Sequence, residues 1–459
     1  MFPVAAASAS ISLLDDLFGA LRAACVLGCL VEHGLGLVAV QVLYERCAAI
    51  DIGRDVIAVA VRLPGDGPDG RVTDKRMFKT FYGVLRHAAR WLMSLGVTHV
   101  AMEATGVYSM PVYHALIEHG GFARVLVCNA GHVKNVPGRK TDLSDAEWLV
   151  HLLECGLLRG GFIPPADIKA ARDVLRYRRK LVESRTSELS RLGNVLQDGG
   201  IKVDSVASSL TTKSARAVIE SLIDGERRPA VLAEVALGRM RVKIPDLERA
   251  LEGRFDDHHA LMCRLHLDHL DHIDEMIIKL DAQVEAMMEP FRVQRELIQT
   301  VPGIGPLASA AVLSEIGADP ASSFDTAGHL ASWTGLCPGN HESAGKRHHG
   351  RRRKGNQYVQ PIMVECAWAA VRHPGYLQTL YHRQVRRFGG FRSSVAKQKA
   401  IIAVAHAMIV IIWHILATGR PYHDLGPDYF TYRIDPERET QRLLAKLHAL
   451  GHTVTLDAA

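Results

Sequence analysis

Four carboxylates have the types and spacing needed for chemistry on a phosphate. Asp51 lies inside the apolar segment CAAIDIG, and Glu103 ends the apolar segment HVAME. Asp142 and Asp145 stand three residues apart in GRKTDLSDAEWL, at the start of an expected helix. A buried carboxylate is costly unless a cation or proton compensates it, so four at one sheet edge would need divalent cations such as Mg²⁺ or Mn²⁺. Two such ions stabilise the attacking and leaving oxygens of phosphoryl transfer.

Each carboxylate motif also has a simpler interpretation. Thr141 or Asp142 would serve as a helix N-cap, and Asp145 or Glu147 as a first-turn acid that the helix dipole favours. The segment IDIG also opens the phosphate-binding hairpin of actin-like sugar kinases and ATPases. Those proteins need a second Gly-rich phosphate loop, and the sequence has no such loop linked to a strand. We therefore favour the metal-binding interpretation.

Ser343 is the candidate nucleophile. It lies in NHESAGKRHHGRRRKGN, residues 340–356, where a serine hydroxyl in a Gly-containing loop would approach a phosphodiester closely. Neighbouring cations would stabilise the charge that develops on the phosphate and hold the strand by its phosphates. Those cations are Lys346, Arg347, Arg351, Arg352, Arg353 and Lys354. A solvated surface loop, the alternative, uses the same residue types.

The segment VPGIGPLASA predicts a Gly-rich turn between two helices. Gly303 and Gly305 would free backbone amides at a helix start, where they grip a phosphate without reading bases. A tight interhelical turn is the alternative, and the two interpretations are compatible.

The composition is that of a globular protein, and the placement of its charge suggests a polyanionic partner, with a solvated basic face as the alternative. Of the 459 residues, 48% are hydrophobic and 23% charged, which excludes a disordered chain. Residues 292–399 carry 15 Lys and Arg against 6 Asp and Glu, a local charge of +9 that exceeds the +6 of the whole chain.

The eight cysteines show no CxxC pair, so we expect free thiols and a cytoplasmic protein. The apolar segment 400–416 is short for a membrane span and contains two histidines, so we expect a core helix and no membrane partner.

Periodicity and turn residues divide the chain into five regions. Residues 1–43 are expected to be a loosely attached extension. Residues 44–162 alternate strands, over CAAIDIG, DVIAVAVRL, THVAMEAT and ARVLVCNA, with helices over MPVYHALIEHG and SDAEWLVHLLECG, which predicts an α/β domain. Residues 163–295 predict a helical, coiled-coil region, residues 296–420 a mainly α-helical domain with a helix-hairpin-helix-like motif, and residues 421–459 a tail.

The helical region carries an apolar seam that needs a partner. Its members follow 3,4,3,4,3 spacing: Leu270, Ile273, Ile277, Leu280, Val284 and Met287. A second chain would cover the seam in a homo-oligomer, a dimer or tetramer; the helix near 170–197 of the same chain is the alternative. The histidines at 266, 269 and 272 are three apart, and we favour a solvated face over a metal site.

These motifs together resemble one family of insertion-sequence transposases. AIDIG, AMEATGVYS, GRKTDLSDAEWL, VPGIGPLASA and ASWTGLCPGNHESAGKRHHGRRRKGN occur in the order seen in the DEDD transposases, the bridge-RNA-guided recombinases. The resemblance covers about residues 44–415. It implies a ribonuclease H/RuvC-like N-terminal domain and a C-terminal transposase domain bearing a catalytic serine. The family's Ser-Gly-Gly is here Ser-Ala-Gly.

The resemblance carries roles to individual residues. Its metal-binding tetrad matches Asp51, Glu103, Asp142 and Asp145, and its serine matches Ser343. It implies DNA as substrate, Mg²⁺ as cofactor and a noncoding guide RNA as partner. We therefore predict a recombinase that moves its own insertion element through a covalent serine–DNA intermediate. A junction-resolving nuclease that uses the metal site alone, or a non-catalytic nucleic-acid-binding protein, are the alternatives.

Overall fold

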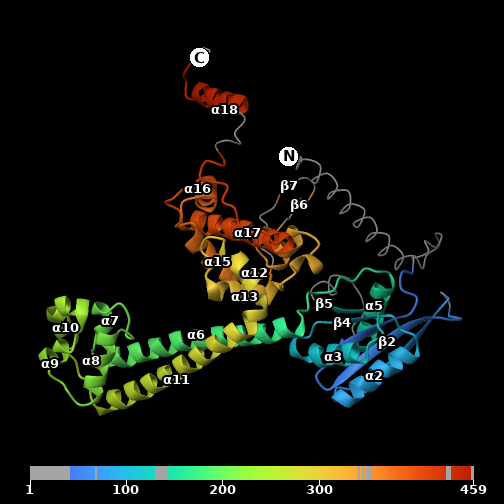
Figure 1. Cartoon of the computed structure of the whole chain (residues 1–459), viewed down its shortest axis with the longest axis horizontal. Helices are drawn as coiled ribbons and strands as arrows, with labels where there is room; N and C mark the ends of the chain where they lie inside the picture. Colours follow the sequence, from blue (N-terminus) through green and yellow to red (C-terminus); the bar gives the residue numbers. More distant parts are fainter. Residues whose placement is uncertain are drawn as a thin grey trace. The chain divides into compact units, whose positions relative to one another are not determined.

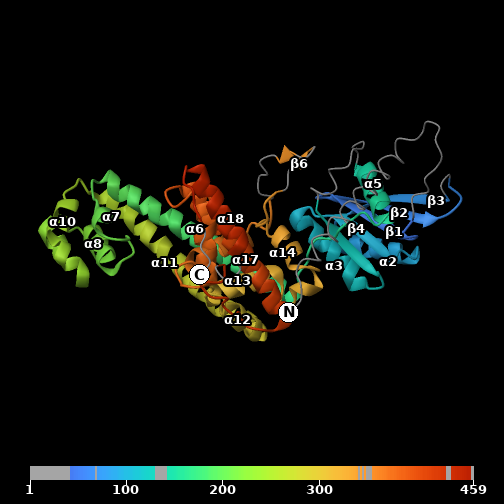
Figure 2. The ribbon, with the colours of Figure 1, turned by 90° about the horizontal axis from the view of Figure 1, so that it is seen from above.

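The computed structural model describes residues 42–67, 70–129, 142–339, 342–343, 346–347, 354–430 and 436–455. The expected extension, apart from residues 42 and 43, lies outside this set. The chain divides into two compact units between Ile163 and Pro164, and we describe each unit by itself (Figures 1 and 2).

The first unit contains a five-stranded sheet. Its strands are β1 (Cys47–Ile52), β2 (Val56–Pro64), β3 (Arg71–Lys79), β4 (His99–Glu103) and β5 (Arg124–Cys128), in the order β3-β2-β1-β4-β5. β1 is antiparallel to β2 and parallel to β4, and β4 is parallel to β5. The helices are α2 (Tyr82–Ser94), α3 (Ser109–His119) and α5 (Asp142–Glu154), with a 3₁₀ turn over Gly106–Tyr108. The predicted α/β class, hairpin and strands are confirmed, whereas β3 and α2 were not predicted.

Helices cover both faces of this sheet. On β1, Ala48 and Ile50 pack with α2 and α3, while Cys47 and Ala49 pack with α5. This alternation follows from the period of two along a strand. A strand whose two faces are both covered reads as a continuous apolar run, as β1 does.

The second unit begins with two long helices that form a stalk. α6 (Ala166–Asp198) and α11 (Asp257–Met288) run antiparallel, since Arg178 contacts Asp281 while Arg185, further along α6, contacts Asp274. Figure 1 shows a small helical subdomain at one end of this stalk. It consists of α7 (Val203–Val206), α8 (Lys213–Ile223), α9 (Pro229–Glu234) and α10 (Ile244–Ala250), with a 3₁₀ turn over Gly238–Lys243.

The apolar seam of α11 is covered by α6. Leu270, Ile273 and Val284 are at most 1% exposed, and α6 contributes Leu181 and Leu192 among its buried side chains. The partner is therefore the helix of the same chain that the sequence offered as the alternative. The seam by itself does not require a second chain, and an intermolecular coiled coil is not confirmed.

Polar side chains also meet inside the stalk, around Glu188, which is 4% exposed. His266 Nδ1 lies 2.6 Å and His269 Nδ1 3.2 Å from Glu188 Oε1, and Arg191 donates to Oε2 at 2.6 Å. Burial raises the pKa of Glu188, but the hydrogen bonds from His266, Arg191 and His269 outweigh it and lower the pKa to about 2. Two of the three spaced histidines thus contact a buried carboxylate rather than only solvent, which corrects the solvated-face interpretation.

The rest of the second unit is mainly helical, as predicted. Its elements are α12 (Arg292–Gln299), α13 (Pro306–Ile316), α14 (Ala327–Trp333), β6 (Glu342–Ser343), β7 (Lys346–Arg347), α15 (Val359–Ala370), α16 (Tyr376–Phe388), α17 (Ser394–Thr418) and α18 (Pro436–Ala449), with 3₁₀ turns over Glu289–Phe291 and Pro320–Ser322. Length and apolar composition alone would let α17 cross a membrane. It packs instead against α12, α14, α15 and α16, with side chains such as Val404, Met408 and Ile412 fully buried.

Candidate functional site

Asp51 and Glu103 lie at neighbouring positions on one face of the sheet. Ile50 pairs with Met102 across the parallel strands β1 and β4, and Asp51 and Glu103 are the next residues of the two strands. Asp51 also pairs with Ala58, and Glu103 with Cys128, both of which belong to the core cluster under α5. The two half-buried carboxylates therefore sit on the α5 face at the carboxyl ends of adjacent parallel strands.

Helix α5 runs antiparallel to β1 and brings its N-terminal end toward those strand ends. At the other end of the helix, the carbonyl oxygen of Glu154 accepts hydrogen bonds from the backbone amides of Leu43 (2.9 Å) and Tyr44 (3.2 Å), just before β1 starts. The twelve residues from Glu154 back to Asp142 span about 18 Å at 1.5 Å per residue. Asp145 is exposed and precedes the fully buried Ala146. The side chain of Asp142 lies outside the described residues.

The pKa of the thiol of Cys128, which pairs with Glu103 across two strands, is raised. Burial, and then the Glu103 carboxylate, raise the pKa of the Cys128 thiol to about 11, so this thiol is neutral at physiological pH. An uncharged thiol is neither a nucleophile nor a metal ligand. Cys128 is therefore not a candidate nucleophile or metal ligand at this end of the sheet.

The donor set at this sheet edge suits a hard divalent cation. Within the described side chains, no group of three or more His, Cys, Asp or Glu residues is arranged so that it could hold a metal ion. Mg²⁺, however, is commonly held by one or two carboxylates together with water and substrate phosphates, and carboxylate oxygens are the ligands it prefers. Asp51 and Glu103, on paired strands, fit that requirement.

A buried ionic cluster at the far end of α5 was not predicted from the sequence. Glu154, 4% exposed, accepts hydrogen bonds from Arg71 Nε at 2.7 Å and Arg62 Nε at 3.2 Å. These arginines belong to β3 and β2, so the cluster fixes the C-terminal end of α5 against the sheet. It thereby helps to set the position of the N-terminal end of the helix, where Asp142 and Asp145 lie. The one sequence signal was a Glu in the otherwise apolar run LVHLLECG.

Ser343 lies on a short β-hairpin. β6 pairs with β7 in antiparallel register, Glu342 opposite Arg347 and Ser343 opposite Lys346. Of the six predicted cations, Lys354 is described with its side chain and is exposed, and the backbones of Lys346 and Arg347 belong to β7. Arg351, Arg352 and Arg353 lie outside the described residues.

Hydrogen bonds and a close backbone approach join the two ends of the segment that carries Ser343, which form its base. The Asn356 amide donates to the Trp333 carbonyl at 3.1 Å, and Gln360 Nε2 donates to the Gly335 carbonyl at 2.9 Å. A Cβ at Gly355 would lie 2.2 Å from the Gly335 nitrogen, so only glycine permits this approach. The residues that flank the serine-bearing segment are thus fixed to each other.

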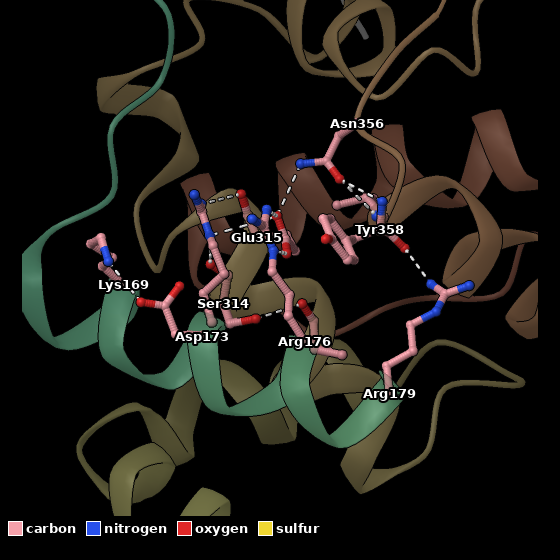
Figure 3. A network of polar contacts seen from close by, with 11 residues as sticks. Lys169, Asp173, Arg176, Arg179, Ser314, Glu315, Asn356 and Tyr358 are labelled. Carbon is pink, nitrogen blue, oxygen red and sulfur yellow. Dashed lines mark hydrogen bonds and ion pairs between the residues drawn. The ribbon is translucent and has the colours of Figure 1, made fainter. Parts of the chain in front are cut away.

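A buried polar network joins this base to the stalk (Figure 3). The carboxylate of Glu315 on α13, 3% exposed, accepts both nitrogens of Arg176 on α6, at 2.7 and 2.8 Å. Glu315 also accepts Asn356 Nδ2 at 2.9 Å, and Asn356 Oδ1 in turn accepts the amides of Tyr358 and Val359 at the start of α15. One carboxylate therefore holds three segments together.

One further arginine of α6, Arg172, extends the network. Arg172 donates to the carbonyls of Ser314 and Glu315, each at 2.9 Å, and the Arg176 guanidinium lies 3.9 Å from the centroid of the Tyr358 ring. Burial lowers the pKa of Arg172, and Glu315 partly restores it. The sequence signal was again an acid in an apolar helix, SAAVLSEIG, which the sequence interpretation did not use.

Gly303 and Gly305 of the Gly-rich turn differ in structural role. Gly303 has φ +83°, and a Cβ there would lie 2.4 Å from the Cys366 carbonyl oxygen, so this residue permits close packing on α15. Gly305 is the exposed residue before α13, with open space where a Cβ would stand. The tight-turn interpretation thus accounts for Gly303, and phosphate binding stays a prediction for Gly305.

The chain is similar in sequence to transposases. A profile described as the transposase IS116/IS110/IS902 family matches residues 295–382, and a transposase profile named DEDD_Tnp_IS110 matches residues 48–200. The first match ends inside α16, and the second spans nearly the whole sheet and all of α6.

Curated relatives extend the similarity. The transposase for insertion sequence element IS1111A of Coxiella burnetii is 24% identical over 390 residues, 82% of this chain and 91% of the relative. A putative transposase of Sinorhizobium fredii is 25% identical over 290 residues, 62% of this chain and 64% of the relative. The pilin gene-inverting protein of Moraxella lacunata is 26% identical over 165 residues, 34% of this chain and 48% of the relative. The chain thus spans most of the first relative and about half of the last.

Proposed function

Because the chain belongs to the IS110/IS116 family of transposases, and is therefore a DNA-recombining enzyme, we propose that it exchanges DNA strands through a serine nucleophile and a carboxylate-bound divalent metal. The nucleophile is Ser343. The metal is Mg²⁺, with Mn²⁺ as a substitute, and its ligands are Asp51, Glu103, Asp142 and Asp145. A noncoding RNA selects the DNA sites, and the enzyme works as a homo-oligomer in the cytoplasm.

The observation that carries the proposal is the register of β1 with β4. It supports a shared site because Asp51 and Glu103 follow directly on the paired residues Ile50 and Met102, on the face that α5 covers. Parallel strands with acids at their carboxyl ends are a frequent position for active sites in α/β folds. A divalent cation bound there would neutralise phosphate charge and stabilise the attacking and leaving oxygens.

The serine step balances without a further reactant. The Ser343 hydroxyl oxygen forms a bond to the phosphorus of a DNA strand as the bond from phosphorus to one deoxyribose oxygen breaks. The serine proton passes to a base, and the leaving deoxyribose oxygen takes up a proton to become a free hydroxyl. Attack by the hydroxyl of another strand reverses the step and releases the serine. The backbone pairing of β6 with β7, and the closed base of this segment, support a defined backbone position for Ser343.

The experiment compares Ser343→Ala and Asp51→Asn in the full chain, with donor DNA, target DNA and the RNA that copurifies with the protein. We expect wild-type protein to give a protein–DNA adduct that denaturant leaves intact and protease removes. Ser343→Ala should give no adduct and no exchange but bind nucleic acid normally. Asp51→Asn should lose the response of activity to Mg²⁺.

Each alternative function gives a different pattern. A junction-resolving nuclease would cut with Ser343→Ala as with wild type, and a non-catalytic binder would show no metal-dependent activity at all. Exchange by Ser343→Ala, or an adduct at another side chain, contradicts the role of Ser343. Unchanged metal dependence of Asp51→Asn contradicts the carboxylate site.

A further inference from the structure

We propose that the corner between α16 and α17 binds single-stranded DNA, an inference that rests on the proposed strand exchange on DNA. The corner lies beyond residues 295–382 matched to the family and apart in sequence from the basic segment around Ser343. Its cations are Arg386, Arg387, Arg392, Lys397 and Lys399, on the last turn of α16, the connecting turn and the start of α17. Figure 1 shows α16 against α17 in the C-terminal part of the second unit.

These five cations differ from three arginines that contact the stalk helix α11 in having no protein partner among the described residues. Arg178, Arg185 and Arg216 each make a two-nitrogen contact with an aspartate of α11. Across the described part of the chain, none of the five corner cations forms a side-chain hydrogen bond or an ion pair. The 58 residues between Glu365 and Asp424 contain eight Lys and Arg and no acid, so the neighbouring sequence supplies no counter-charge. Five unpaired cations in one place indicate an anionic partner from outside the chain.

Helix dipoles do not explain the cluster. Arg386 and Arg387 lie in the last turn of α16, where the dipole favours cations. Lys397 and Lys399 lie in the first two turns of α17, where the dipole disfavours them, and the first turn of α17 has no acid. The mutual repulsion of these charges is relieved when phosphates bind, so charge complementarity favours a nucleic-acid backbone.

Two exposed aromatic rings stand among the cations. Phe388 is 39% and Phe391 44% exposed, on either side of Gly389 (φ +126°) and Gly390 (φ +85°). Phe391 is held by a ring contact with His382 at 5.4 Å. Aromatic rings beside a line of cations are typical of sites where unpaired bases stack while the backbone is gripped. Duplex DNA hides its base faces, so this combination favours a single strand over a duplex.

The electrostatic half of the proposal is tested with Arg386→Gln/Arg387→Gln/Arg392→Gln in the full chain. We expect the plot of log affinity against log salt for a mixed-sequence single-stranded DNA to lose about 2 in slope, since each phosphate contact on a single strand contributes about 0.7. The control, Lys213→Gln/Arg239→Gln/Arg254→Gln, removes the same charge from exposed residues of the subdomain at the stalk end. It should leave the slope nearly unchanged. Equal effects of the two triple variants would overturn the proposal.

The stacking half is tested with Phe388→Leu/Phe391→Leu. On the single-stranded DNA we expect a loss of affinity of at least about fivefold, the lower end of what stacking on one aromatic ring provides. An abasic strand of equal length should bind the variant and the wild type equally. An equal loss on both strands, or a larger loss on duplex DNA or RNA than on single-stranded DNA, overturns the assignment.

These binding measurements separate the inference from the proposed function. They need no catalysis, so Ser343→Ala protein should give the same salt slope as wild type even though it exchanges no strands. Failure of the corner variants to change binding would leave the result of the adduct experiment untouched. Strand exchange by Ser343→Ala would in turn leave the slopes untouched.

Discussion

Replacing Glu315 by Gln should loosen the base of the serine-bearing segment more than any surface substitution. The side chain is 3% exposed and its two oxygens accept three hydrogen bonds, from both nitrogens of Arg176 and from Asn356. Removing one member of a buried ion pair typically costs about 3–5 kcal/mol, because the other charge stays buried without compensation. Arg176 is 33% exposed and water can partly solvate it. Arg172, at 8%, cannot be solvated in this way, so we expect about 3 kcal/mol.

The measurement is native-state amide hydrogen exchange on peptides from α13 and α15. Exchange resolves local opening, whereas a single melting curve would combine the two compact units. The matched control is Glu183→Gln, which removes an exposed partner of Lys180 and Arg179 on the same helix, α6. It should leave exchange in α13 and α15 close to wild type. If both variants gave the same small change, the network would be a set of surface contacts and our account of the anchored base would be wrong.

Three further outcomes follow from buried positions. The stability advantage of wild type over Glu188→Gln should be complete above pH 4.5 and disappear as pH falls toward about 2, because the folded-state pKa is depressed; acid titration of unfolding checks this. Gly303→Ala should cost at least about 2 kcal/mol in urea unfolding, from backbone strain and the lack of room for a Cβ. Gly305→Ala, at the N-cap of α13 with open space for a Cβ, should cost less, about 1 kcal/mol. Ile273→Ala should lose about 2–5 kcal/mol at every protein concentration, since the seam is covered within one chain; a concentration-dependent midpoint would show an intermolecular seam instead.

The sequence predicted the first unit where its signals were local. β1 is a continuous apolar run, and the turn to β2 contains Gly53, so both strands and their pairing were predictable. β3 has the sequence RVTDKRMFK and lies at the edge of the sheet, with polar residues on both faces. An edge strand needs no apolar face of its own, because the hydrogen bonds to β2 hold it, so periodicity does not reveal it.

Parts of the candidate site depend on contacts between distant residues, which periodicity does not encode. Asp51 and Glu103 were expected to lie at one sheet edge because each belongs to an expected strand. In contrast, the hydrogen bonds that hold Glu154, at the far end of α5, join residues 83 and 92 positions apart. Glu315 meets Arg176 across 139 residues and Asn356 across 41. An acidic residue in an apolar helix predicts that its side chain has a polar partner, but the sequence does not identify that partner. The choice between a second chain and α6 for the seam of α11 was open for the same reason.

The length of the stalk sets both the distance and the orientation of the helical subdomain at its end. α6 and α11 have 33 and 32 residues, so the helical subdomain sits about 50 Å along the pair at 1.5 Å per residue. Deleting seven residues from each helix would withdraw the subdomain by about 10 Å while rotating it by only about 20°, because seven residues make nearly two turns. Deleting five would turn it by well over a quarter of a revolution. In relatives whose stalk helices differ in length by seven residues, the helical subdomain would therefore lie at a different distance along the stalk but face nearly the same direction.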